Sequence, residues 1–91
     1  MNVTILYFGQ ARDLAGVERE RVEAQAGASL DGIIRSTVER HGADLRKILL
    51  DAEGRVRQSV LVSVNNDVVF TSSATANDGD EIALFSAVAG G

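Results

Sequence analysis

Hydrophobic and polar residues alternate with the period of a β-strand at the start of the chain. In NVTILYF, residues 2–8, the odd-numbered and even-numbered side chains fall on opposite faces, and both faces are largely apolar. A strand that is apolar on both faces is typical of the centre of a sheet. In the next stretch, VERERVEA (residues 17–24), charged and less charged residues alternate, which predicts an exposed edge strand.

Apolar residues recur at helical spacing between Leu30 and His41 and form a stripe along one side of a predicted helix. Ser29 suits the N-cap of this helix, because its hydroxyl oxygen can accept a hydrogen bond from an unpaired backbone N–H group. Asp31 suits the first turn, because its negative charge is favourable near the positive end of the helix dipole. Gly42 suits the C′ position at its end. A second, short helix is expected over ADLRKILL, residues 43–50, where the apolar residues also group on one face.

The remaining patterns predict three further strands and the loops between them. GQARDLAG, residues 9–16, reads as a loop closed by glycines. SVLVSVN (residues 59–65) and VVF (68–70) read as a hairpin joined at an Asn-Asn-Asp turn, and EIALF (81–85) as the last strand. This order of elements predicts an α+β fold in one domain, residues 1–91, with the helix packed on one face of a mixed sheet.

Composition narrows the classes of partner. Hydrophobic residues make up 45% of the chain, enough for a core, and the net charge of −4 argues against nucleic acid, which is bound by clustered Lys and Arg. The chain has no cysteine, so it has neither disulfides nor a thiol nucleophile of its own. Because no apolar run approaches the length of a membrane span, we expect no membrane association and a cytoplasmic location.

Side chains suited to catalysis are few. The single histidine, His41, ends a predicted helix, where a capping or dipole role is favoured over a catalytic one. Asp78, Asp80 and Glu81 cluster without the ligand spacing of a calcium loop and read as the turn before the last strand, so no metal site is expected. Neither a phosphate-binding loop nor a paired serine and histidine is evident. We expect no catalysis by the chain alone.

The distinctive group is the α-carboxylate at the end of FSAVAGG, Phe85 to Gly91. A carboxylate becomes an acyl donor once a good leaving group such as AMP replaces its oxygen. Two glycines make a slender tether that could enter another protein's active site. Residues 86–91, which we predict to be a flexible tail, would reach about 20 Å if extended.

Three stretches resemble the ubiquitin-like sulfur carriers, the family that includes the small subunit of molybdopterin synthase. DGDEIALFSAVAGG, residues 78–91, is similar to the family's C-terminal signature of an acidic turn, an apolar strand and a terminal Gly-Gly. VTILYFGQARDLAG (3–16) resembles its first strand and following loop, and VSVNNDVVF (62–70) its hairpin. The resemblance implies the β-grasp fold, with adjacent, parallel first and last strands.

The resemblance also implies a mechanism and partners. An ATP-dependent activating enzyme of the ubiquitin-activating type would adenylate Gly91, and sulfur would convert it to a thiocarboxylate. The large subunit of molybdopterin synthase would then receive the tail and pass the sulfur to a pterin precursor. Gly90, Ala89, Val88 and Phe85 would contact the partner, with a plain core role as the alternative for Phe85. No permanently bound cofactor is expected, since ATP is used by the activating enzyme.

Several alternatives remain open at this level. Molybdopterin carriers commonly have Pro-Pro where this chain has Ser86 and Ala87, and the middle segment, residues 45–60, is longer than theirs. The Ala-Val-Ala-Gly-Gly ending also resembles carriers that supply sulfide for cysteine synthesis. Carriers for thiamine or tRNA thiolation are further possibilities, as is a ubiquitin-like modifier, whose self-linkage would use the single Lys47 or the N-terminus. The last is a β-grasp domain that only binds.

Overall fold

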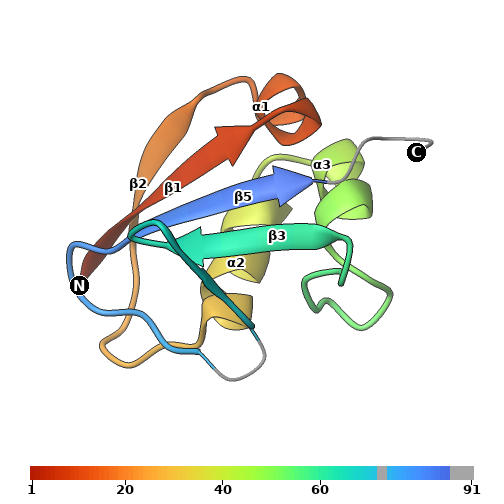
Figure 1. Cartoon of the computed structure of the whole chain (residues 1–91). Coiled ribbons are helices and arrows are strands. Elements are labelled where there is room, and N and C mark those ends of the chain that lie inside the picture. The colour runs from red at the N-terminus through yellow and green to blue at the C-terminus, as the bar shows by residue number, and fades with distance from the viewer. Residues whose placement is uncertain (72–73, 87–91) are drawn as a thin grey trace.

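A computed structural model describes residues 1–71 and 74–86 of the chain. Its five strands form one sheet in the order β2-β1-β5-β3-β4, and the longest helix, α2, lies behind the sheet in the view of Figure 1. Along the chain the elements are β1 (Asn2–Phe8), α1 (Gln10–Ala15), β2 (Arg19–Glu23), α2 (Leu30–Glu39), α3 (Ala43–Leu49), β3 (Val60–Val64), β4 (Asp67–Val69) and β5 (Glu81–Ser86).

The first and last strands lie side by side and parallel at the centre of the sheet, as predicted (Figure 1). Their register pairs Thr4 with Glu81 and Phe8 with Phe85. The other neighbours, β1 with β2, β5 with β3 and β3 with β4, are antiparallel, which makes the sheet mixed. β2 is an edge strand, in agreement with its charged pattern. This is the arrangement that the β-grasp resemblance implied.

The core lies between one face of the sheet and the helices. In β1 the side chains of Val3, Ile5 and Tyr7 are buried, whereas the alternate side chains are half-buried or exposed. β1 therefore has apolar residues on both faces because it lies at the centre of the sheet, although other parts of the protein cover only one of those faces. From α2 the core takes Leu30, Ile33, Ile34, Thr37 and Val38, which are the residues of the helical stripe.

Two local predictions are wrong. The segment expected as a loop, residues 9–16, contains the helix α1, which buries Ala11 and ends at Gly16 in the left-handed conformation, with φ 79°. The glycines thus flank a short helix instead of closing a loop. α2 ends at Glu39 with Arg40 as its cap, and Gly42 is the N-cap of α3 instead of the C′ residue of α2. Among the described helices, none combines the length and apolarity needed to cross a membrane.

Candidate functional site

The face of the sheet opposite α2 carries a row of apolar side chains at the end of β5. Phe85 of β5 pairs with Phe8 of β1 on one side and with Leu61 of β3 on the other, so that the three side chains project from the same face. The rings of Phe8 and Phe85 stack with centroids 4.5 Å apart and planes 9° from parallel. Phe8, Phe85 and Leu61, hereafter the apolar row, are 42%, 37% and 48% exposed.

The apolar row has the character of a docking surface. Single exposed apolar residues are common on proteins, but neighbouring large ones that share one face mark sites of interaction with another molecule. Two of the three are aromatic, and stacked rings supply a large, rigid contact area at little cost in side-chain entropy. The row crosses the sheet at Phe85, one residue before β5 ends at Ser86.

Phe85 is thus a surface residue, and the alternative that assigned it to the core is wrong. It lies one residue before Ser86, which was predicted to be the first residue of the tail but is the last residue of β5 and pairs with Val60. The other residues expected to act or to contact the partner, Val88, Ala89, Gly90 and Gly91, lie outside the described residues. The hydroxyl oxygen of Ser86 is buried without a hydrogen-bond partner among the residues that the structure describes.

The acidic turn before β5 connects that strand to the start of β1. The Oδ1 atom of Asp78 accepts a hydrogen bond from the backbone N–H of Asn2 at 2.7 Å. The N–H of Gly79 donates to the carbonyl of Asn2, also at 2.7 Å, and Gly79 needs its φ of 85° for this turn. The N–H of Thr4 donates to the carbonyl of Asp80. The turn therefore sets the register in which β5 enters the sheet beside β1.

Asp80 connects the same turn to the β3–β4 hairpin. Its carboxylate accepts hydrogen bonds from the side-chain amide of Asn65 at 2.9 Å and from the N–H of Asn77 at 2.8 Å. The Oδ1 atom of Asn65 in turn accepts from the N–H of Glu81 at 2.9 Å. Within residues 1–71 and 74–86 no group of acidic or histidine side chains could hold a metal ion. The acidic motif positions β5, as its interpretation as a turn predicted.

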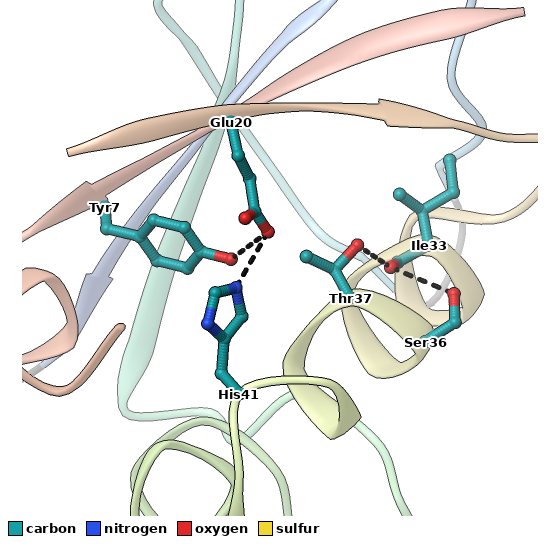
Figure 2. Close-up of polar contacts among 6 residues, drawn as sticks. All are labelled: Tyr7, Glu20, Ile33, Ser36, Thr37 and His41. Carbon is teal, nitrogen blue, oxygen red and sulfur yellow. Dashed lines mark hydrogen bonds and ion pairs between the residues drawn. The ribbon is translucent and has the colours of Figure 1, made fainter. Parts of the chain in front are cut away.

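A polar cluster on the covered side of the sheet was not predicted. The Oε1 atom of Glu20 in β2 accepts a hydrogen bond from the Tyr7 hydroxyl and lies 2.9 Å from Nε2 of His41, as Figure 2 shows. The rings of Tyr7 and His41 meet edge to face, with centroids 5.6 Å apart. The His41 ring therefore bonds to β2 instead of capping α2, whose end His41 reaches only through its backbone N–H to the carbonyl of Val38.

The cluster fastens three elements together: β1, β2 and the link between α2 and α3. Burial raises the pKa of the Tyr7 hydroxyl far above its usual range, and the hydrogen bond and charge of Glu20 raise it further. Tyr7 therefore stays neutral and acts as a donor. One feature of the sequence could have indicated this cluster. Glu20 lies on the inward face of β2 together with Val22, and a charged side chain on that face needs a partner.

We expect replacement of Glu20 by alanine to lower the free energy of unfolding by about 1–3 kcal/mol, since the buried Tyr7 hydroxyl loses its acceptor. Glu23→Ala, at an exposed position of the same strand, should change it by about 0.5 kcal/mol or less. Urea denaturation of both variants provides the measurement. Equal, small effects of the two substitutions would show that the cluster contributes nothing to stability.

Comparison with known proteins shows the family to which this chain belongs. The sequence profile of the ThiS family matches residues 5–91, which is nearly the whole chain. The chain belongs to the ThiS family. This confirms the resemblance to ubiquitin-like sulfur carriers that its C-terminal signature indicated.

Individual relatives of this ThiS-family chain agree in length and fold. The molybdopterin synthase sulfur carrier subunit of Chlamydomonas reinhardtii is 28% identical over 92 residues, which cover 100% of both chains. The crystal structure of SAMP1 from Haloferax volcanii superposes with a TM-score of 0.84 at 22% identity, again over 100% of both chains, and confirms the β-grasp fold. A chain in the Amycolatopsis orientalis BexX/CysO complex is 29% identical with a TM-score of 0.68, covering 98% of this chain and 99% of that one.

Proposed function

We propose that this ThiS-family protein carries sulfur as a thiocarboxylate on Gly91 and donates it to the large subunit of molybdopterin synthase. The observation that carries the proposal is the family match, which extends through Gly91 and so includes the Gly-Gly ending. The end-to-end similarity to a molybdopterin synthase sulfur carrier subunit supports this acceptor. We place the protein in the cytoplasm, with no role for it as a catalyst by itself.

The chemistry requires an activating enzyme. A carboxylate oxygen of Gly91 attacks the α-phosphorus of ATP, and pyrophosphate leaves, which forms an acyl adenylate. A sulfur nucleophile then attacks the acyl carbon and AMP leaves, so that one oxygen of the carboxylate is replaced by sulfur. ATP belongs to the activating enzyme, and the carrier needs no bound cofactor. The protein's own contribution is to present an unhindered acyl carbon at the end of a narrow tether.

The described residues provide the fixed base for this tether. β5 lies at the centre of the sheet, paired along both sides, so its end has a defined position. The apolar row crosses the sheet at that end and would hold the acceptor enzyme while residues 87–91, which span at most about 17 Å, reach into its active site. Phe85 is then the partner contact nearest to the tail, and Val88, Ala89 and Gly90 would lie inside the acceptor's entry channel and contact its walls.

A second candidate acceptor is favoured by one observation. The chain in the BexX/CysO complex is 29% identical to this one, which is similar to the identity of the molybdopterin synthase relative. A sulfur carrier for an acceptor other than molybdopterin synthase, such as an enzyme of cysteine or thiamine synthesis or tRNA thiolation, would use the same tail and the same apolar row.

Transfer of labelled sulfur separates these candidates. We expect the thiocarboxylated protein to pass its sulfur to the pterin precursor when the large molybdopterin synthase subunit of the same organism is added. No transfer should occur without that subunit or with the unmodified protein. Sulfur delivery only in the presence of a cysteine-synthase homologue would overturn the choice of acceptor, although the carrier role would stand.

A further inference from the structure

The open face of the sheet, which lies opposite α2, continues beyond the apolar row. Two residues away from the row along each strand, Ala83 of β5 has Leu6 of β1 on one side and Ser63 of β3 on the other. Ser63 pairs in turn with Val68 of β4. Ala83 and Ser63 are only 7% and 8% exposed, whereas Val68 is 63% exposed. Two small, buried side chains therefore occupy the centre of this face, with larger side chains around them.

These two buried residues belong to the open face and not to the core. In β3 the core takes Val60 and Val62, and Ser63 alternates with them, on the same side of the strand as Leu61. Ala83 is buried as well, but it is not among the residues that form the core. The low exposure of both therefore comes from larger neighbours on the open face and not from cover by the helices.

Ser63 is the exception among the buried polar residues. In the described part of the chain these residues are Thr37, Ser63 and Asp80. The Thr37 hydroxyl donates to the carbonyl of Ile33 at 2.8 Å, and the Asp80 carboxylate has the two donors given above. The Ser63 hydroxyl, in contrast, makes no hydrogen bond with any residue of 1–71 or 74–86. Buried polar groups normally have a partner, so this one calls for an explanation.

The hydroxyl oxygen of Ser63 is accessible from outside the protein. Among the described residues, Ser86 alone has a side-chain oxygen that is sealed from solvent and lacks a partner. Ser63 lies within a nearly buried residue but is not sealed in this way, so its oxygen faces the surface of the sheet. A group from another molecule can therefore reach it.

The surroundings of this hydroxyl determine which group suits it. Phe85 and Leu61 rise beside it, so the backbone of a protein that rests on the apolar row stays above the centre of the face, and a side chain is needed to reach Ser63. A charged side chain would lose its hydration there without a counter-charge, because Arg19 and Glu81 already pair with each other at 3.2 Å. Tyrosine and tryptophan combine an apolar ring with an O–H or N–H at its tip, and both commonly anchor interfaces.

We propose that Ala83 and Ser63 receive a tyrosine or tryptophan side chain of the acceptor enzyme. Its ring packs on Ala83, and its polar tip forms a hydrogen bond with the Ser63 hydroxyl. The proposal rests on the proposed function, because this site is continuous with the apolar row through Phe85 and Leu61. The apolar row provides attraction without direction, and Ser63 adds a directional contact. An acceptor that lacks the polar aromatic side chain would leave the hydroxyl unpaired, which makes Ser63 a specificity-determining residue.

Calorimetric titration of the large molybdopterin synthase subunit of the same organism with Ser63 variants tests the hydrogen bond. Ser63→Ala removes only the hydroxyl and should weaken binding about tenfold, because the tip of the partner's side chain is left buried and unpaired. Ser63→Val makes the face more apolar and suits a strand, yet it should also weaken binding about tenfold or more. Ser36→Ala removes a hydroxyl from α2, on the other side of the sheet, and should bind as the wild type does.

Fluorine NMR of the acceptor identifies the side chain that reaches Ser63. The large subunit is labelled with fluorotyrosine or fluorotryptophan, and the carrier is unlabelled, so its single tyrosine gives no signal. We expect one resonance of the acceptor to shift when the wild-type carrier or Ser36→Ala binds, and to shift differently or not at all when Ser63→Ala binds. Circular dichroism of each carrier variant checks the fold, and Ser63→Ala decides the test if Ser63→Val does not fold.

Three results would overturn the proposal: wild-type affinity of Ser63→Ala, an affinity of Ser63→Val equal to or above that of the wild type, and no fluorine resonance that depends on the Ser63 hydroxyl. Sulfur transfer at saturating acceptor distinguishes this from a failure of the proposed function. The thiocarboxylated Ser63 variants should then transfer sulfur at the wild-type rate, because their tail is unchanged. A wild-type carrier that neither binds the large subunit nor supplies it with sulfur would overturn the proposed function, and the acceptor named here with it.

Discussion

Deletion of Gly91 should abolish sulfur transfer, with a loss of at least about 100-fold, and leave the melting temperature unchanged. The loss of transfer follows from reach, because removing one residue retracts the acyl carbon by about 3.5 Å, and a misplacement of about 1 Å can already cost 100-fold. Stability should not change, since every buried apolar residue in the described part of the chain lies at or before Leu84. Product formation and melting temperature are measured on the same samples.

A substitution at the neighbouring position separates reach from width. Gly90→Val keeps the length of the tail but widens it by a branched side chain, and we expect it to reduce transfer severely. Gly90→Ala adds a single methyl group and serves as the milder comparison. For the first prediction, full activity of the protein that lacks Gly91 would exclude the tail as the sulfur donor. A large drop in the melting temperature of that protein would instead assign Gly91 to the folded core.

Phe85→Lys should weaken binding of the acceptor enzyme by about 30-fold or more, because the buried aromatic anchor of an interface typically contributes about 2 kcal/mol or more. The substitution places a charge in the apolar row and removes the ring that stacks on Phe8. Since Phe85 is 37% exposed in the free protein, the fold should persist. Isothermal titration of the acceptor with each variant provides the affinity, and circular dichroism checks the fold.

Gln25→Lys is the matched control for this effect. It adds the same charge at an exposed position after β2, near the end of the sheet where Ala24 pairs with Met1, and thus away from the apolar row. We expect wild-type affinity for this variant. If both lysine variants bind as the wild type does, the apolar row is not the docking surface; if both bind equally weakly, the added charge and not the lost ring is responsible.

The positions of the strands along the chain could be predicted, because they follow from patterns that the sequence displays directly. Alternation identified the strands at residues 2–8, 17–24, 59–65 and 81–85, and the parallel pairing came from the family resemblance. The acidic turn was recognised from its composition. Its partners were not, since the bond from Asp80 to Asn65 joins residues whose proximity depends on the folded hairpin.

Side-chain environments were harder to predict than elements. The stripe that ends at His41 suggested a helix terminus, but the position of Glu20 across the sheet decides where the imidazole bonds. The exposure of Phe85 depends on which face of the sheet the helices cover, and alternation alone does not distinguish the two faces of a strand that is apolar on both. The helix α1 was missed because it is too short for helical periodicity to show.

The most direct test of the sulfur-carrier role is the mass of the protein after incubation with its activating enzyme, ATP and a sulfur donor. We expect an increase equal to the replacement of one oxygen by sulfur, and fragmentation should place the added mass on Gly91. The increase should require ATP and be absent from the protein that lacks Gly91. An unchanged mass with every activating enzyme of the organism, or a sulfur located on another residue, would contradict the account.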